Sequence, residues 1–411
     1  MLATNLRVDR NRFLGRLAAL ARIGGSAEGG VQRMALTDGD KAGRDQLVAW
    51  FRAAGLTVHI DRIGNIVGVL PGETDLPPVM MGSHIDTVAH GGKYDGVLGV
   101  LAGLEVIETI RDSGVKPKRG LAVAAFTNEE GARFQPDMLG SYVWAGTFTV
   151  EDSYAIRDSD GKALGEELRR IGYAGTAEPG FLKPCAYLEL HIEQGPILDA
   201  EGGGIGAVTG VQAIWWSEVT IEGEANHAGT TPMSYRRSAA MAAAELIAFA
   251  ERLALEIPGT VANCGTIAFE PGNVNVVPRR AVFTLDIRNP DDESIRRVEA
   301  RLTDCIAEIG ARRGVGIARR DLARFAAQPF DEQMIGRVEA AATALGLPVR
   351  RMVSGAGHDA QALAPQVPTA MIFVPSVKGI SHNPEELTGD DDLVAGANVL
   401  LVTALDLVTA A

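Results

Sequence analysis

This 411-residue chain repeats one arrangement five times. A short apolar segment is followed by a histidine or an acidic residue, and a glycine or proline comes soon after that residue. Apolar runs of this length are typical of buried strands. In an open α/β sheet, the carboxyl ends of the strands meet where ligands bind. The pattern therefore predicts an α/β sheet with one polar site at its edge. The residues at these positions are His84, Asp95, the pair Glu129 and Glu130, His191 and His382.

Helix and strand patterns alternate on both sides of a central stretch of the chain. The expected helices lie at 38–54, 96–112, 332–345 and 390–409, and the expected strands at 56–60, 65–70, 79–83, 121–127, 187–190 and 369–374. Such alternation predicts a sheet covered by helices, and hence an α/β domain.

The central stretch has the order strand, helix, strand, strand, helix, strand. Its expected helices lie at 234–254 and 290–313, and its expected strands at 214–223, 261–270, 275–288 and 315–323. In the second helix, Ile295, Val298 and Leu302 repeat at helical spacing. This order matches the split βαβ, ferredoxin-like unit. We therefore expect a discontinuous domain, 1–210 with 327–411, and a smaller α+β domain, 211–326, inserted into it.

Charge and composition argue against several classes of partner. The chain has 39 lysines and arginines against 52 aspartates and glutamates, a formal charge of −13. This balance argues against nucleic-acid binding and against a basic membrane anchor. We find no signal-peptide core and no run of 18 apolar residues, and Cys185, Cys264 and Cys305 lack metal or disulfide spacing. We expect a cytoplasmic protein that binds neither nucleic acid nor membrane.

The histidines and carboxylates near the strand ends suggest a metal site. His84 and Asp86 are two positions apart and share one face of an extended chain, so Asp86 can hold the second imidazole nitrogen through its carboxylate or carbonyl. Taken singly, each group has a plainer explanation as a strand-end histidine, an N-cap aspartate or a solvated pair of glutamates. Together they form a donor set without thiolates, which suits two ions of zinc, manganese, cobalt or nickel.

Eight segments resemble, in the same order, those of the dinuclear-metal N-carbamoyl-L-amino acid amidohydrolases and their relatives allantoate amidohydrolase and β-ureidopropionase. They are GSHIDTVAHGGKYDG, TNEEGARF, HIEQGP, GEANHAGTTPM, NVNVVP, LDIRNP, SGAGHDA and GISHNPEE. One departure is Tyr94, where a phenylalanine is common. The family belongs to the superfamily of aminoacylases and zinc exopeptidases. The resemblance implies a zinc-exopeptidase-like α/β catalytic domain with an inserted ferredoxin-like lid and dimerisation domain.

The resemblance also implies a role for each residue of the donor set. Glu129 would be the general base, which takes a proton from the attacking water and returns it to the leaving nitrogen. Asp86 would orient the imidazole of His84. The metal ligands would form two sets that share one aspartate, namely His84, Asp95 and His191 for one ion and Asp95, Glu130 and His382 for the other.

Further residues would bind the substrate. Arg288 is similar to the arginine that binds the substrate α-carboxylate, and Asn275 and Gln194 match substrate-binding amides. His227 resembles a histidine that polarises the scissile carbonyl across a dimer interface. Without the resemblance, Arg288 is explained as a surface arginine, Asn275 as a turn residue and His227 as a loop histidine. His358 lies in a segment similar to a site-lining loop and receives no chemical step.

The resemblance thus implies a homodimeric, metal-dependent amidohydrolase. Its substrate would be a small carboxylate-bearing ureido compound, an N-carbamoyl-L-amino acid, whose carbamoyl C–N bond is hydrolysed to give the amino acid, ammonia and carbon dioxide. Three alternatives stay open: an allantoate amidohydrolase, an aminoacylase or peptidase, and an amino-acid-binding protein without catalysis. The last would be expected to lack Glu129 or a metal ligand, and all of these are present.

Overall fold

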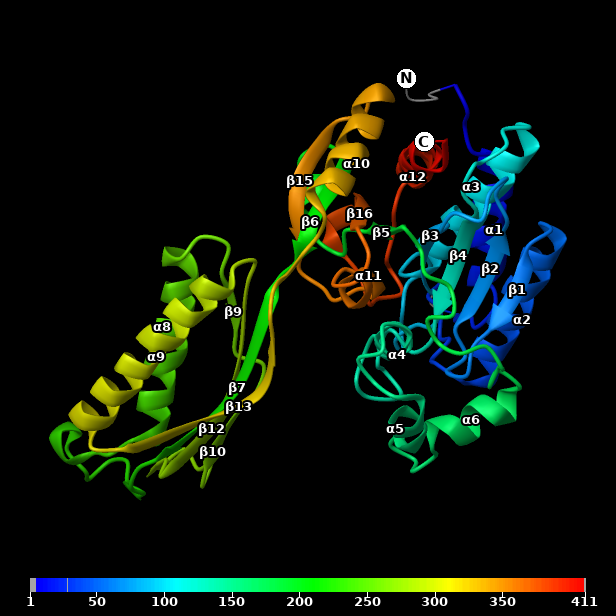
Figure 1. Cartoon of the computed structure of the whole chain (residues 1–411). Coiled ribbons are helices and arrows are strands. Elements are labelled where there is room, and N and C mark those ends of the chain that lie inside the picture. The colour runs from blue at the N-terminus through cyan, green and yellow to red at the C-terminus, as the bar shows by residue number, and fades with distance from the viewer. Residues whose placement is uncertain (1–4, 28, 410–411) are drawn as a thin grey trace. The chain divides into compact units, whose positions relative to one another are not determined.

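The computed structural model describes residues 5–27 and 29–409. The chain folds as two compact units (Figure 1). The larger unit comprises Met1–Gly210 and Pro329–Ala411, and the inserted unit comprises Val211–Gln328. The role of the inserted unit as a lid and dimerisation domain stays a prediction.

A nine-stranded mixed sheet forms the centre of the larger unit. Its strands are β1 (Thr57–Ile60), β2 (Ile66–Leu70), β3 (Val79–His84), β4 (Leu121–Phe126), β5 (Ala186–Ile192), β6 (Ile205–Val211), β14 (Gln328–Pro329), β15 (Val349–Ser354) and β16 (Thr369–Val374). The order is β1-β2-β4-β3-β5-β16-β6-β14, and β15 pairs with β6. The middle strands β4, β3, β5 and β16 are parallel, and all their residues are buried. Burial on both faces explains their largely apolar sequences.

Helices cover this sheet. They are α1 (Arg10–Ala21), α2 (Asp38–Ala53), α3 (Val97–Asp112), α4 (Leu139–Trp144), α5 (Val150–Ala155), α6 (Leu164–Ile171), α7 (Ile197–Ala200), α10 (Glu332–Ala344), α11 (Asp359–Leu363) and α12 (Asp390–Thr409). By length and composition α12 could cross a membrane, but 67% of its apolar window is buried in the structure. It packs on α3, β5 and β16, and is therefore a core helix of this unit.

The inserted unit is an antiparallel sheet with two long helices on one face (Figure 1). Its elements are β7 (Ala213–Glu222), β8 (Asn226–His227), α8 (Ala239–Glu256), β9 (Val261–Asn263), β10 (Ile267–Glu270), β11 (Val276–Val277), β12 (Arg280–Asn289), α9 (Asp292–Arg313) and β13 (Gly316–Phe325). The sheet order is β10-β12-β7-β13, β9 also pairs with β12, and β8 pairs separately with β11. This order is that of a ferredoxin-like unit, as the element pattern predicted.

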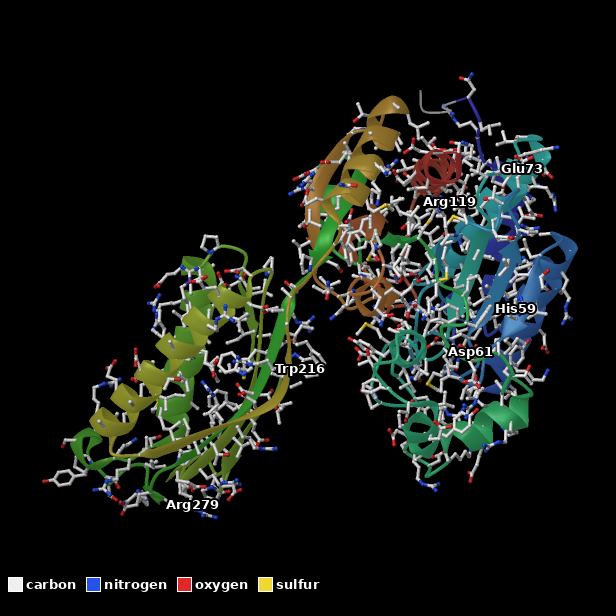
Figure 2. The ribbon with its side chains drawn as sticks, viewed as in Figure 1. His59, Asp61, Glu73, Arg119, Trp216 and Arg279 are labelled. Atoms are coloured by element: carbon white, nitrogen blue, oxygen red, sulfur yellow. The ribbon has the colours of Figure 1, made fainter. Side chains whose placement is uncertain are left out.

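Side chains alternate between the two faces of this sheet. Trp215, Phe283 and Ile287 are fully buried in the core under α8 and α9. Trp216 (Figure 2) and Arg288 point to the opposite side, which we call the open face. The open face is therefore accessible to a ligand.

Two expectations for the inserted unit were wrong in detail. The helix expected at 234–254 starts only at Ala239, because Ser238 caps it by accepting a hydrogen bond from the N–H of Met241. The expected strands 261–270 and 275–288 are each divided in two. Pro278 lies at the second break, where a residue without an N–H cannot continue the ladder.

Candidate metal centre

The parallel strands bring the expected metal ligands to one edge of the larger unit's sheet. His84 ends β3, Glu130 follows β4, and His191 is the last residue but one of β5. His382 lies in the loop after β16. Asp95 lies just before α3, two residues ahead of its first residue, Val97, where the helix dipole favours a carboxylate.

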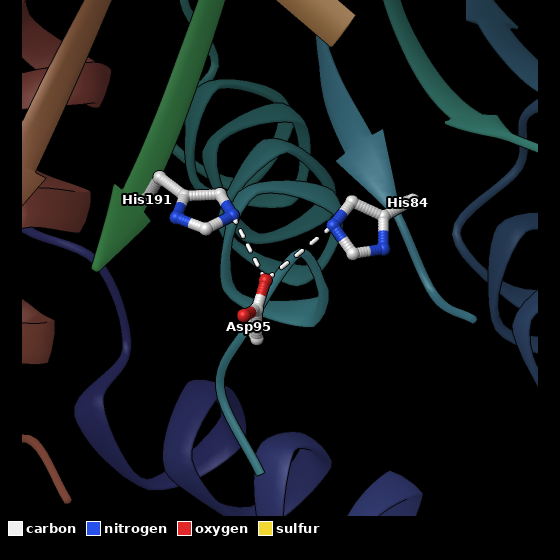
Figure 3. A group of neighbouring side chains, drawn as sticks. All are labelled: His84, Asp95 and His191. Atoms are coloured by element: carbon white, nitrogen blue, oxygen red, sulfur yellow. Dashed lines mark ion pairs between the residues drawn. The ribbon is translucent and has the colours of Figure 1, made fainter. Parts of the chain in front are cut away.

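His84, Asp95 and His191 form the first donor cluster (Figure 3). The Nε2 atoms of His84 and His191 lie 3.5 and 3.2 Å from the same oxygen, Oδ1 of Asp95. All three residues are buried. Two donors held about 2.1 Å from one tetrahedral zinc ion lie roughly 3.4 Å apart. The observed spacings and donor types therefore fit a divalent ion.

Asp95, Glu130 and His382 form the second donor cluster. Nε2 of His382 lies 3.4 Å from Oδ2 of Asp95 and 3.3 Å from Oε2 of Glu130. Because Oδ1 of Asp95 faces the first cluster and Oδ2 the second, this carboxylate lies where a shared ligand belongs. His382 is the accessible member, with 51% of its side chain exposed.

The groups of the two clusters perturb each other's pKa. Burial alone would lower the pKa of His84, but the carboxylates of Glu129 and Asp95 raise it well above its usual value. Burial opposes ionisation of Asp95, yet hydrogen bonds to three histidines hold its pKa well below the usual range. Burial and the charge of Asp95 raise the pKa of Glu130 to about 8. Buried carboxylates that repel one another in this way are stabilised by cations.

Backbone groups orient the two buried imidazoles. Nδ1 of His84 lies 2.9 Å from the carbonyl oxygen of Asp86, and Nδ1 of His191 lies 2.9 Å from that of Ile192. These contacts turn both Nε2 atoms toward Asp95. Gly96 is required beside them, because a Cβ there would lie 2.4 Å from the ring of His84 and its φ is +65°.

Asp86 contacts more than its neighbouring histidine. Its carbonyl holds His84, whereas its carboxylate oxygens accept the N–H groups of Glu129 and Glu130, each at 3.3 Å. The side chain of Asp86 therefore holds the turn that carries both glutamates.

Glu129 lies beside the first cluster, with Oε2 3.2 Å from Nε2 of His84. Burial raises its pKa well above the usual value. The preceding residue, Asn128, has a φ of +58° and donates from Nδ2 to the carbonyl of Phe134 at 2.8 Å. Asn65 accepts the N–H of Thr127 at 2.9 Å and so holds the start of the same turn.

Gln194, an expected substrate-binding residue, lies in the metal centre. Its Nε2 donates to Oδ2 of Asp95 at 2.8 Å, and its N–H donates to the hydroxyl of Ser376 at 3.0 Å. Gln194, Asn128 and His382 all have left-handed backbone, with φ between 52° and 58°. Such conformations are costly for residues with side chains, and they concentrate at functional sites.

Two buried residues without an expected role also belong to this region. His358 packs against His191 with ring centroids 4.5 Å apart, and its Nε2 shares a hydrogen bond with Ser354. Glu386 accepts the N–H groups of Tyr94 and Asp95 at 3.0 and 3.2 Å. In the sequence, the one indication that Glu386 belongs to this region is its position four residues after His382, within the same segment.

A small cavity of about 110 Å³ opens onto both clusters. A larger hollow of about 970 Å³ runs along α1 elsewhere on this unit, and its lining contains no histidine. The donor groups, and not the size of a cavity, therefore indicate where a reaction would take place. The small cavity is lined by Asp95, Glu129, Glu130, Asp137, His191, Gln194, Ala356, Gly357, His358 and His382.

The inserted unit holds the other three expected site residues. Strand β8 pairs with β11, and the N–H of Ala228 donates to the carbonyl of Asn275 at 2.9 Å. His227 and Asn275 are therefore close together, and both are exposed. Arg288 lies on β12, on the open face, beside Asp286.

Comparisons with known proteins show which family the chain resembles in sequence and fold. The profile of peptidase family M20/M25/M40 matches residues 80–406. The N-carbamoyl-L-amino-acid amidohydrolase of Rhizobium meliloti is 44% identical over 404 residues, covering 98% of this chain and 97% of that protein. The allantoate amidohydrolase of Bacillus subtilis is 34% identical and covers 93% of each chain. A crystal structure of an amidase of the hydantoinase/carbamoylase family from Burkholderia multivorans matches with a TM-score of 0.96 at 44% identity, covering 98% of this chain and 99% of that one.

These matches run along nearly the whole chain, and they confirm the fold class and the family expected from the sequence. The family is metal-dependent, in agreement with the two donor clusters. The chain belongs to peptidase family M20/M25/M40 and is one of its amidohydrolases.

Proposed function

We propose that this amidohydrolase hydrolyses the carbamoyl C–N bond of an N-carbamoyl-L-amino acid and releases the amino acid, ammonia and carbon dioxide. The observation that supports this most is the carboxylate of Asp95, which faces a donor cluster with each oxygen. Two divalent ions, when bound there, would polarise the ureido carbonyl and make a water more acidic. Zinc, manganese, cobalt and nickel all suit these nitrogen and oxygen donors.

Glu129 is the proposed general base. Because burial raises its pKa, the carboxylate is suited to accept a proton and then release it. It takes a proton from the attacking water and passes it to the terminal nitrogen, which leaves as ammonia. The carbamate that remains on the amino acid then loses carbon dioxide. Asp86 holds the backbone of Glu129 during these transfers.

The substrate carboxylate is proposed to bind Arg288, whose guanidinium can offer two parallel N–H donors to it. Asn275 and Gln194 are proposed to bind further polar atoms of the substrate. Allantoate also carries a carboxylate and ureido groups, so the same residues suit it. The Bacillus subtilis relative supports allantoate as a second candidate substrate.

His227 is proposed to stabilise charge on the carbonyl oxygen in the partner subunit of a homodimer. Its Nδ1 accepts the N–H groups of Gly229 and Thr230 at 3.0 and 3.1 Å. A neutral imidazole that accepts at Nδ1 carries its proton on Nε2, which can donate to an oxyanion. The loop after His227 exposes Met233 (70%) and Tyr235 (76%), residue types that are enriched in interfaces between subunits. We also propose that the enzyme is cytoplasmic.

Metal analysis combined with an ammonia-release assay tests the proposal. We expect two ions per chain and ammonia from at least one N-carbamoyl-L-amino acid. The ratio of kcat/KM values for that compound and for allantoate decides between the two substrates. An aminoacylase or peptidase would form its products without ammonia. Less than one ion per chain after reconstitution, with no ammonia from any of these compounds, would refute the proposal.

A further inference from the structure

On the open face of the inserted unit, Arg288, the proposed ligand of the substrate carboxylate, is paired with Asp286, which has no part in the function proposed above. Nε of Arg288 lies 3.0 and 3.2 Å from the two carboxylate oxygens of Asp286, and Nη2 lies 2.9 Å from Oδ2. The two residues are two positions apart on β12, so their side chains leave the same face of the strand. The side chains are 25% and 28% exposed. The ion pair therefore joins two residues close in sequence, uses two nitrogens of the guanidinium, and is partly shielded from water.

We infer that Asp286 is a positioning residue for substrate binding, because its carboxylate fixes the plane and direction of the Arg288 guanidinium. The inference rests on the proposed function, in which Arg288 binds the substrate carboxylate. A guanidinium carries five N–H donors in a planar fork. A carboxylate on its Nε edge is therefore compatible with a second carboxylate on another edge. Holding the group in place before binding reduces the side-chain entropy that binding would otherwise cost.

The surroundings of Asp286 suit this role. Trp216 lies directly opposite Asp286 on β7, and a cavity of about 250 Å³ adjoins both, with Leu322 and Thr284 in its lining. Trp216 is 40% exposed and Leu322 45% exposed. Asp286 is the charged residue among those that line this cavity. Asp286 therefore contacts the guanidinium of Arg288 and also lines an accessible, largely uncharged hollow.

A second ion pair on the same face provides a matched control. Arg320 on β13 donates from Nε to Glu218 on β7 at 2.8 Å. The side chain of Glu218 is 27% exposed, nearly the same as that of Asp286. Removing Glu218 therefore deletes an equally exposed carboxylate and an Arg–carboxylate pair from this sheet but leaves the Asp286–Arg288 pair intact.

An inhibitory contact is the main rival explanation. If Asp286 drew the guanidinium away from the substrate, its removal would strengthen substrate binding. If Asp286 positions the guanidinium, its removal weakens binding. The sign of the change in KM therefore separates the two explanations.

The test uses the full-length, metal-loaded enzyme and the variants Asp286→Ala, Asp286→Asn and Glu218→Ala. Substrates are N-carbamoyl-L-methionine and its neutral carboxamide. For Asp286→Ala we expect KM for the carboxylate substrate to rise about tenfold while kcat stays within about twofold. KM for the carboxamide should not change. Asp286→Asn, which keeps one acceptor oxygen, should have an intermediate effect, and Glu218→Ala should behave as the wild type.

A lowered or unchanged KM in Asp286→Ala overturns the inference, as does an equal loss with both substrates, which a merely structural role would cause. Calorimetric binding of L-methionine gives a readout without turnover. If Arg288→Ala weakens this binding and Asp286→Ala does not, the inference fails and the proposed role of Arg288 stands. If the wild-type enzyme neither binds L-methionine nor hydrolyses any carbamoyl amino acid, the proposed function and the inference both fail.

Discussion

Replacing Glu386 should weaken the metal centre without removing a metal ligand. This buried carboxylate accepts the N–H groups of Tyr94 and Asp95 with one oxygen and the hydroxyl of Ser381 with the other. In Glu386→Ala both N–H groups lose their acceptor, and a buried unpaired donor costs about 1–3 kcal/mol. The free energy of unfolding should therefore fall by at most about 2–6 kcal/mol, because burial and the charge of Asp95, which raise the pKa of Glu386 to about 7, already disfavour this carboxylate. Because Asp95 is the proposed shared ligand, metal affinity should also fall about 10–100-fold.

Two measurements and two further variants check this prediction. Urea unfolding of the metal-free protein gives the stability, and competition with a chromophoric chelator gives the metal affinity. Glu386→Gln keeps a carbonyl oxygen for the two N–H groups and should retain most of both. Glu385→Ala is the matched control, since Glu385 is the neighbouring carboxylate and is exposed. Wild-type affinity and stability in Glu386→Ala, or an equal loss in Glu385→Ala, would refute the reasoning.

Three further predictions concern the proposed base, the proposed dimer and a buried aspartate. Glu129→Gln should lower kcat by about 10²–10⁴-fold with an unchanged metal content, because the general base is lost; unchanged turnover would show that another group is the base. Mixed Glu129→Gln and His227→Ala chains, each inactive alone, should regain about a quarter of wild-type activity in a symmetric dimer, and no recovery would mean that His227 acts within its own chain. Burial raises the pKa of Asp61 (Figure 2) to about 7, outweighing its hydrogen bonds from Asn65. Because this pKa lies above the usual 3.8, the stability that Asp61 contributes is present below about pH 4 and is lost as the pH rises through about 7. Urea unfolding from pH 5 to 8 should therefore show a falling stability that Asp61→Asn flattens, and an identical slope in the variant would contradict the assignment.

The clustering of the proposed metal ligands could be predicted from the sequence because most of these residues lie at or after the ends of buried parallel strands. His84 and His191 lie at or near the ends of strands whose residues are all buried, and a parallel sheet necessarily brings such ends to one edge. The contacts of Gln194 and Glu386 could not be predicted in this way. They depend on loop conformation, such as the φ of +58° at Gln194, which hydrophobic periodicity does not record. The late start of α8 has a similar cause, since the local cap at Ser238 overrides helix propensity.

Four carboxylates also explain how an acidic chain would accept the proposed anionic substrate. Asp86, Asp95, Glu129 and Glu130 are close together and carry up to four negative charges when all are ionised. The two divalent ions proposed for this centre would supply 2 × 2, or four, positive charges, so the loaded centre would be close to neutral while the whole chain carries −13. Without the ions, the same carboxylates would repel a substrate carboxylate at short range, where salt screens buried charges little. In the proposed function, the acidity at the sheet edge is therefore needed to bind the cations, and the cations in turn are needed to bind the substrate.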